Sequence, residues 1–202
     1  MTISLLAAAR ARRHTRNRTP GTIHLRCLTP DDGRHVTDLL KRMSPDSRYQ
    51  RYFRPVHSFR PADIARFVTL SRDHVAVGAF DGPSLIGIAQ SLRSSKQPDR
   101  AEVAGEVADL HHGRGVATRL VNELAELATD VGVTHFTATV LTDNRPVLAL
   151  MRSLGWPTEA TLDGAYAEVL LTLPAELALA TAGRTAMDWD GGWQPRGAVV
   201  AS

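Results

Sequence analysis

The chain has 202 residues, of which 43% are hydrophobic and 22% charged, a composition ordinary for one globular domain with loose ends. It excludes wholesale disorder, collagen and disulfide-rich scaffolds, and the single cysteine, Cys27, allows neither an internal disulfide nor a cysteine-based zinc cluster. The net charge of +3 depends on the start of the chain, where five arginines lie within residues 1–18 and no acidic residue comes before Asp31. We therefore expect a disordered, solvated basic arm over residues 1–21.

No apolar run approaches the roughly 20 residues that a membrane-spanning helix needs. The apolar start at residues 3–9 also comes before its arginines rather than after them. The sequence thus predicts no membrane span and no secretory signal, and with one cysteine it favours a cytoplasmic setting. Contact of the arm with nucleic-acid phosphates and a mitochondrial targeting role are the less favoured alternatives.

Apolar residues alternate with polar ones in the predicted strands and recur at three- and four-residue spacing in the predicted helices. In chain order these are a strand at 23–28, helices at 36–43, 46–53 and 61–70, strands at 74–80, 85–92 and 101–108, a helix at 116–131, a strand at 134–141, a helix at 144–154, and strands at 158–162 and 166–173. Gly132 follows the 116–131 helix, where a left-handed residue is expected. The stretch between the strand ending near Asp109 and the one starting near Thr134 is long enough for a helical crossover between parallel strands. We expect an α/β domain over residues 22–174, followed at 175–202 by an extension that is partly helical or disordered.

A glycine-rich segment precedes the longest predicted helix. Its residues are His112, Gly113, Arg114, Gly115, Val116 and Ala117. Glycine lets the chain turn without a Cβ penalty, and a helix N-terminus offers unpaired N–H groups at the positive end of the dipole, which suits a phosphate group. The spacing fits neither a P-loop nor the dinucleotide fingerprint, so on spacing alone a purely structural turn is an equally good interpretation.

The surrounding residues 107–120 resemble motif A of the GNAT acetyltransferases, whose pattern is Gln/Arg-x-x-Gly-x-Gly/Ala. Gly115 and Ala117 match this pattern, whereas His112 departs from it by standing in the Gln/Arg place.

Two further segments are similar to the same family, and the resemblance covers roughly residues 22–174. Asn144 opens a predicted helix that ends at Gly155 and Trp156, as in the family's second signature, where Asn opens a helix that ends in Gly-Phe or Gly-Tyr. Residues 40–53 resemble a Leu-Ser-Pro-Glu-Ser-Arg segment before Arg-Phe-Phe in the bacterial protein lysine acetyltransferase (Pat-like) branch.

The resemblance implies a GNAT fold, in which a mixed, mostly antiparallel sheet splays between two parallel strands and is flanked by helices. It implies acetyl-CoA as cosubstrate, no metal, and direct attack of a neutral primary amine on the thioester, with a small molecule or a protein lysine as acceptor. Main-chain groups of Val107 and Asp109 would pair with pantetheine, those of residues 113–117 would hold the pyrophosphate, and Asn144 would bond the cofactor or order the neighbouring loop. The implied cofactor-binding residues are Val107, Asp109, His112, Gly113, Arg114, Gly115, Val116, Ala117, Thr118 and Asn144, with Arg114 and Thr118 contributing their side chains.

Attack by an amine needs a general base, and Glu102 and Glu106 are the catalytic candidates. They are four residues apart on one strand and so share a face, where a buried strand would carry apolar residues. Glu102 is favoured because it stands where the Pat-like branch has its catalytic glutamate; Glu106 is second, and solvent-facing carboxylates are the remaining alternative. Met151 stands where many family members have a general-acid tyrosine, so the acid is unassigned. Tyr166 is a remote alternative for that role, and packing in the core is the favoured expectation for it.

Other polar features have simpler interpretations. His111 and His112 are expected to be loop residues, since no carboxylate or cysteine accompanies them at metal-ligand spacing. The arginines and aromatic residues of 48–54 are expected on a partly exposed helix face, with an acceptor site as the alternative. Cys27 is expected to be a buried apolar residue. A non-catalytic acyl-CoA-binding module and a nucleic-acid-associated protein stay open as other functions, and a homodimer stays open as the assembly.

Overall fold

The computed structural model describes residues 23–177, so the expected arm at 1–21 and most of the expected extension at 175–202 lie outside the described residues. The described elements are β1 (Ile23–Cys27), the 3-10 turn η1 (Pro30–Asp32), α2 (Gly33–Lys41), α3 (Pro45–Tyr52), α4 (Pro61–Val68), β2 (His74–Asp81), β3 (Ser84–Arg93), β4 (Arg100–Val107), the 3-10 turn η2 (Asp109–His111), α5 (Val116–Thr129), β5 (His135–Leu141), α6 (Arg145–Leu154), β6 (Thr158–Asp163) and β7 (Tyr166–Thr172). Each helix and strand predicted between residues 23 and 173 is present, with its ends shifted by at most a few residues.

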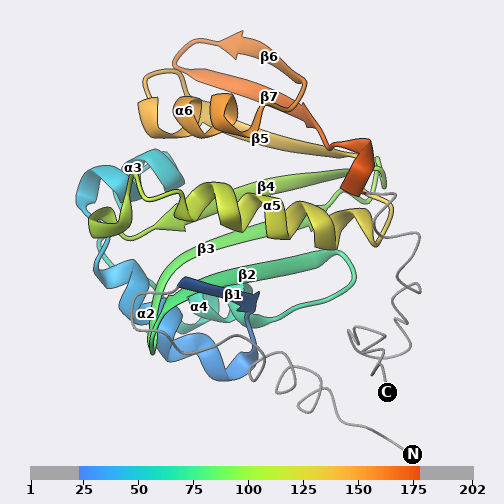
Figure 1. Ribbon diagram of the computed structural model, residues 1–202. Coiled ribbons are helices and arrows are strands. Elements are labelled where there is room, and N and C mark those ends of the chain that lie inside the picture. The colour runs from blue at the N-terminus through green and yellow to red at the C-terminus, as the bar shows by residue number, and fades with distance from the viewer. Residues whose placement is uncertain (1–22, 178–202) are drawn as a thin grey trace, which may run out of the picture.

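Seven strands form one sheet in the order β1-β2-β3-β4-β5-β7-β6 (Figure 1). Every neighbouring pair is antiparallel except β4 and β5, which run parallel and are connected through α5. The expected fold class, a mixed and mostly antiparallel sheet flanked by helices, is confirmed.

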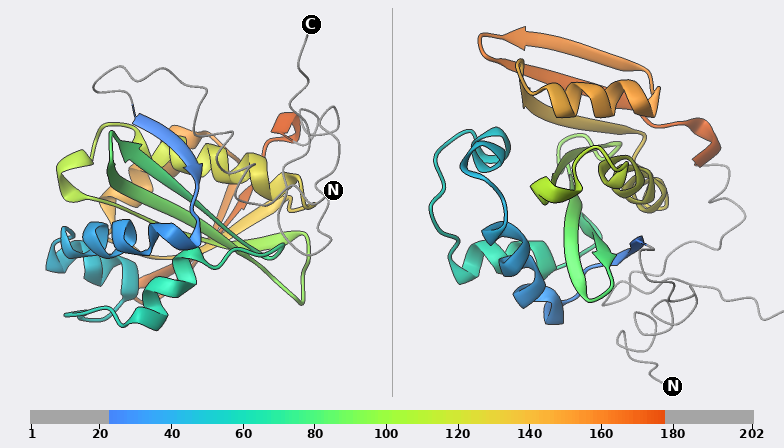
Figure 2. Two further views of the ribbon diagram at one scale, coloured as in Figure 1. Left: turned by 90° about the horizontal axis from the view of Figure 1, so that it is seen from below. Right: turned by 60° about the vertical axis from the view of Figure 1, so that its left-hand side comes forward.

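Helices cover both faces of the sheet. The amphipathic helix α5 packs on β2, β3 and β4 and buries Leu120 and Leu124 completely. On the opposite face, α2 and α4 bury Leu39 and Phe67 in a second apolar cluster, and the right-hand view of Figure 2 shows these two helices across the strands from α5. The sheet therefore lies between two hydrophobic layers, as its largely apolar central strands require.

Short-range hydrogen bonds fix the ends of the elements near β4 and α5. The strand expected to reach residue 108 ends at Val107, because Asp109–His111 form a 3-10 turn in which the His111 N–H donates to the Ala108 carbonyl (2.8 Å). Gly132 follows α5 with a φ of +85°, which confirms the left-handed position expected there. Within residues 23–177, no helix combines the length and the apolar character that crossing a bilayer would demand.

Candidate active site

The two parallel strands part soon after they begin to pair. Their register covers three residue pairs and ends at Glu102↔Thr137. Beyond that point, β4 stays paired with β3 up to Val107, and β5 stays paired with β7 up to Leu141. The sheet therefore opens between the second half of β4 and the second half of β5.

The open edge of β4 consists of main-chain groups. The Ala108 N–H donates to the Ile86 carbonyl of β3 (2.9 Å). Because the bonds of an antiparallel ladder alternate, Val107, Gly105 and Val103 turn their N–H and C=O groups away from β3 and toward β5. Since the pairing with β5 has already ended, an extended ligand that carries amides could bond along this edge as an added strand does.

Two left-handed glycines shape the turn that leads from this edge into α5. Gly113 has a φ of +71° and Gly115 a φ of +72°, and no atom lies within 4 Å of the place where a Cβ would sit on either. Glycine is therefore favoured by backbone conformation and not by crowding. Gly115 is also the N-cap of α5, whose first N–H groups lack intrahelical partners at the positive end of the dipole. A phosphate group would find several donors there.

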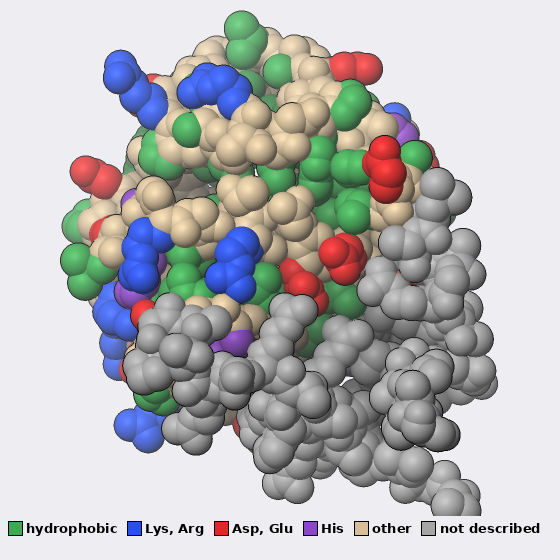
Figure 3. Space-filling view, viewed as in Figure 1, with side chains coloured by type: hydrophobic (Ala, Val, Ile, Leu, Met, Phe, Trp, Pro, Cys, Tyr) green, Lys and Arg blue, Asp and Glu red, His purple; other side chains and the backbone are tan. Residues whose placement is uncertain are grey.

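Two arginines lie near this end of α5 in the sequence. Arg114 and Arg119 are both exposed. On the face shown in Figure 3, most Lys and Arg side chains lie in the left half, where Figure 1 shows α5 beginning, and most acidic side chains lie in the right half. The charge distribution thus suits an anionic ligand at the turn.

His112 folds back onto β4. Its Nε2 lies 2.8 Å from the Val107 carbonyl oxygen and 3.8 Å from an Asp109 carboxylate oxygen. A carbonyl only accepts hydrogen bonds, so Nε2 carries the proton in this contact. The imidazole thus uses one of the two acceptor positions on the carbonyl that was predicted to meet pantetheine. Within residues 23–177, no group of three His, Cys, Asp or Glu side chains is arranged to hold a metal ion.

Thr118 and Asn144 both contact α6. Thr118 Oγ1 lies 3.2 Å from Oγ of Ser153. Asn144 is buried and serves as the N-cap of α6, where its Oδ1 accepts the Val147 N–H (3.2 Å). The Asn144 side chain therefore caps the helix that it opens.

The two candidate bases have opposite surroundings. Glu102 is exposed, and no hydrogen bond or ion pair with another described residue holds its carboxylate. The Glu106 side chain is 1% exposed, and its Oε2 accepts a hydrogen bond from Nε of Arg51 (3.0 Å). Burial raises the pKa of Glu106, although the Arg51 guanidinium opposes this shift. Its Oε1 and the hydroxyl of Tyr52 are both buried without a hydrogen-bond partner among the described residues.

The alternative in which both carboxylates face solvent is therefore wrong for Glu106. Helix α3 packs on β4 and brings Arg51 onto this carboxylate. The contact joins residues far apart in the sequence, so the strand pattern alone could not reveal it.

The arginines of α3 lie on a partly exposed helix face, as expected, and their side chains also bind other segments. Arg48 donates to the carbonyl oxygens of Leu40 (3.1 Å) and Val56 (3.1 Å), and Arg51 is held by Glu106. The side chains of Arg48 and Arg51 therefore connect α3 to other segments, whereas Arg54, beyond the helix, is exposed.

Tyr166 does not pack in the core, which corrects the sequence expectation. Ala167 and Val169 point into the core, so the alternation of β7 turns Tyr166 to the other face, where it is 36% exposed. Its ring stands edge-on to that of Phe53, with 5.4 Å between centroids. Phe53 is the C-cap of α3 and has a left-handed φ of +55°. The end of α3 thereby contacts β7.

The Asp109 side chain makes a contact that sequence reasoning missed. Its Oδ2 accepts the Ser44 N–H (2.8 Å), and its Oδ1 accepts the Ser47 hydroxyl (2.6 Å), both at the start of α3. Burial by itself would raise the pKa of Asp109, but these hydrogen bonds outweigh it and lower the pKa. Ser44 ahead of Pro45 signals a helix start in the sequence, but nothing there identifies the distant carboxylate that receives it.

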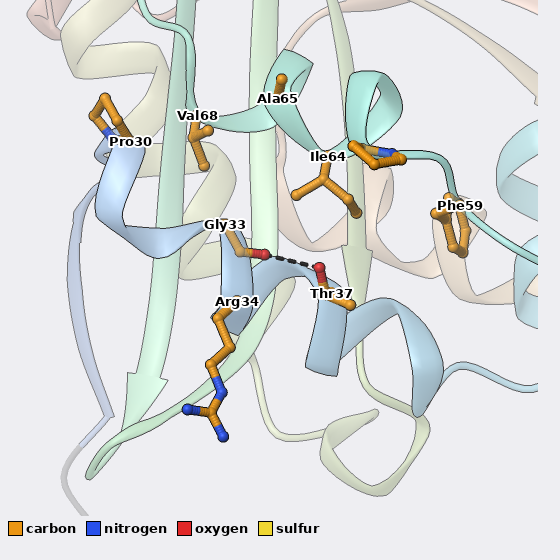
Figure 4. A pocket seen from close by; sticks show the side chains of 9 residues that line it. Pro30, Gly33, Arg34, Thr37, Phe59, Ile64, Ala65 and Val68 are labelled. Atoms are coloured by element: carbon orange, nitrogen blue, oxygen red, sulfur yellow. Dashed lines mark hydrogen bonds between the residues drawn. The ribbon is translucent and has the colours of Figure 1, made fainter.

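A separate hollow of about 460 Å³ lies between α2 and α4 (Figure 4). Its lining residues are Pro30, Gly33, Arg34, Thr37, Phe59, Pro61, Ile64, Ala65 and Val68. The Thr37 hydroxyl donates to the Gly33 carbonyl (2.9 Å), and Arg34 points away from the apolar side chains in Figure 4. None of the predicted site residues lines this hollow.

Comparisons with known proteins identify the family of the chain. The family model described as "Acetyltransferase (GNAT) family" matches residues 36–156. The chain belongs to the GNAT acetyltransferase family.

Two relatives place this GNAT chain more closely, and a third solved structure shares its fold. It is 32% identical over 142 residues to "Acetyltransferase Pat" of Mycolicibacterium smegmatis, covering 68% of this chain and 42% of that protein. The GNAT domain of S. lividans PAT superimposes with a TM-score of 0.71 at 28% identity, covering 76% of this chain and 92% of that domain. Spermidine N-acetyltransferase from Vibrio cholerae shares the fold, with a TM-score of 0.57 at 15% identity over 75% of this chain and 95% of that one. The resemblance to the Pat-like branch is confirmed, and the chain spans less than half the length of the M. smegmatis relative.

Proposed function

We propose that this GNAT chain transfers an acetyl group from acetyl-CoA to a primary amine. The observation that carries the proposal is the end of β4-β5 pairing at Glu102↔Thr137, which leaves the edge of β4 open up to the turn before α5. A peptide-like edge that leads into a phosphate-compatible turn suits a ligand with amides at one end and a diphosphate at the other.

The residues present fit acetyl-CoA in their chemistry. Main-chain groups of Val107 and its neighbours on β4 would pair with the pantetheine amides, as would the main chain of Asp109. The N–H groups of residues 113–117 would hold the pyrophosphate, assisted by the exposed Arg114. Bound acetyl-CoA would supply the thioester whose acyl carbon the amine attacks. We retain His112, Thr118 and Asn144 as residues that border the cofactor.

Glu102 is the group we assign as general base. It is exposed on β4 at the point where the splay begins, so it can reach an acceptor directly or through one water. In this step Glu102 takes a proton from the acceptor ammonium, and the neutral nitrogen forms the new C–N bond. The C–S bond then breaks, the nitrogen loses a second proton, and the departing thiolate takes up one proton, directly or through water, to leave the amide and the CoA thiol. Glu106 is the weaker candidate, because its carboxylate is buried and held by Arg51.

For the acceptor, we propose a protein lysine ahead of a small-molecule amine. The support is the similarity of the chain to Pat and to the GNAT domain of S. lividans PAT. A non-catalytic acyl-CoA-binding module is the second candidate, favoured by Met151 in the place of the family's tyrosine and by the buried state of Glu106. Release of CoA in the presence of lysine peptides or polyamines would separate the two functions.

The cofactor site is tested by calorimetric titration of CoA and acetyl-CoA into the full chain. We expect micromolar binding that Gly115→Glu abolishes, because the new side chain would occupy the turn. The matched control is Gly164→Glu, since Gly164 is also left-handed (φ +58°) with open space around it but lies in the β6-β7 hairpin. If the folded wild-type protein binds neither ligand, the proposed function is wrong.

A further inference from the structure

The segment from the end of β4 to the glycine turn is a stiff, hydrogen-bonded unit. The Ala108 N–H is bonded to β3, and the His111 N–H closes a turn onto the Ala108 carbonyl (2.8 Å). The His112 N–H donates to the Asp109 carbonyl (3.2 Å), and the His112 side chain returns to Val107 (2.8 Å). A ligand that fixes the turn at 113–117 would therefore also fix Asp109.

Asp109 joins this segment to the first turn of α3. Both of its carboxylate oxygens accept hydrogen bonds there, from the Ser44 N–H (2.8 Å) and the Ser47 hydroxyl (2.6 Å). The negative charge also lies at the positive end of the α3 dipole. The other end of α3 is held to β4 through Arg51 and Glu106 (3.0 Å).

The far end of α3 then contacts the opposite side of the opening. Its C-cap, Phe53, packs edge-on against Tyr166 of β7, which pairs with β5. Helix α3 thus contacts elements on both sides of the splay. A shift of α3 would therefore change the space between β4 and β5 that an acceptor amine would enter.

We propose that Asp109 is a positioning residue that couples the glycine turn to helix α3, so that CoA bound at the turn also orders α3. The coupling rests on the proposed function, because CoA is the ligand that transmits it. By reciprocity, an ordered α3 would strengthen CoA binding by the same factor. A residue that merely anchors α3 would protect the helix equally with and without CoA.

The experiment is amide hydrogen exchange on the full chain with and without saturating CoA, using wild type, Ser47→Ala, Asp109→Asn and Asp46→Asn. The reporters are the amides of residues 48–53 in α3 and those of 113–117 in the turn. Asp46→Asn is the matched control, since Asp46 is an exposed acid in the same helical turn. Ser47→Ala removes the 2.6 Å hydrogen bond to Asp109 and the 3.1 Å bond from the Ser44 hydroxyl, and it keeps every charge. It therefore serves as a second test should Asp109→Asn fail to fold.

In wild type and Asp46→Asn, we expect CoA to slow exchange at 48–53 by about 5-fold or more, the lower end of ordinary coupling between sites. In Ser47→Ala and Asp109→Asn, CoA should still slow exchange at 113–117 but change it less than about 2-fold at 48–53. CoA that protects the turn and leaves wild-type α3 unchanged would overturn the coupling while leaving the proposed function intact. CoA that binds nowhere would instead overturn the proposed function.

Discussion

Glu102 and Glu106 carry the same functional group on one strand, but their carboxylates have opposite surroundings. They are separated by about 13 Å at an ordinary strand rise, and the sequence correctly puts them on one face. What the sequence does not contain is the path of α3, which brings Arg51 onto Glu106 and leaves Glu102 open. The exposed carboxylate that we propose as the base and the buried carboxylate that binds Arg51 therefore differ in what covers them.

At Glu102 we expect the substitution Glu102→Gln to lower kcat by about 10²–10⁴-fold, because the amide cannot take the proton of the acceptor. The affinity for acetyl-CoA should stay within a factor of about 2, since no cofactor contact is assigned to this side chain. Steady-state kinetics and calorimetry on the same preparation check both numbers. A rate that is undiminished across the pH range would remove Glu102 as the base.

At Glu106 we expect a pH-dependent effect on stability. Burial raises its pKa above the ordinary 4.5 despite Arg51, so the folded state holds the proton more tightly than the unfolded state. The stabilisation from this linkage is present in full below about pH 4.5 and is lost as the pH rises through the folded pKa. The free energy of unfolding of wild type relative to Glu106→Gln should therefore fall from pH 4.5 toward neutrality.

Urea unfolding of both proteins at a series of pH values measures this difference. The opposite trend is a free energy of unfolding that rises with pH in wild type relative to Glu106→Gln. It would mean that the attraction of Arg51 outweighs burial.

Among the elements, those with the strongest periodicity were predicted most accurately. The apolar spacing of α5 and Gly132 after it predicted the helix and its left-handed end. Asn144 and Gly155 are likewise the first and last capping residues of α6 in the structure. Contacts between distant segments could not be predicted, because their partners do not share a local pattern. The carboxylate of Asp109 belongs to this class, and so do the packing of Tyr166 and the burial of Glu106.

The cap of α6 permits a direct test. Replacing Asn144 by Ala removes the oxygen that accepts the Val147 N–H, and we expect this to lower the free energy of unfolding by about 1 kcal/mol. Asn144→Ser should restore most of the loss, because serine caps a helix nearly as well. Denaturant titration gives the values, with Asp143→Ala as an exposed neighbouring control. An Asn144→Ala protein as stable as wild type would show that the cap contributes little.

The whole molecule is one sheet with an apolar layer on each face, and each layer depends on the same central strands. Leu124 of α5 and Leu39 of α2 are fully buried on opposite faces. We expect Leu124→Ala and Leu39→Ala each to lower the free energy of unfolding by about 2–5 kcal/mol and to leave one cooperative transition. Denaturant titrations followed by circular dichroism and by hydrogen exchange should give the same midpoint of unfolding. Two separated transitions in either variant would show that the layers unfold independently.

The opening between β4 and β5 is made by the point at which two strands stop pairing, so peptide groups line its β4 edge. No substitution deletes a peptide N–H or C=O, except one to proline, which removes the N–H. Side chains along the β6-β7 hairpin can therefore be exchanged in an engineered library while the main-chain edge of β4 persists. In such a library, a new acceptor preference could be selected separately from the ability to hold the acyl donor.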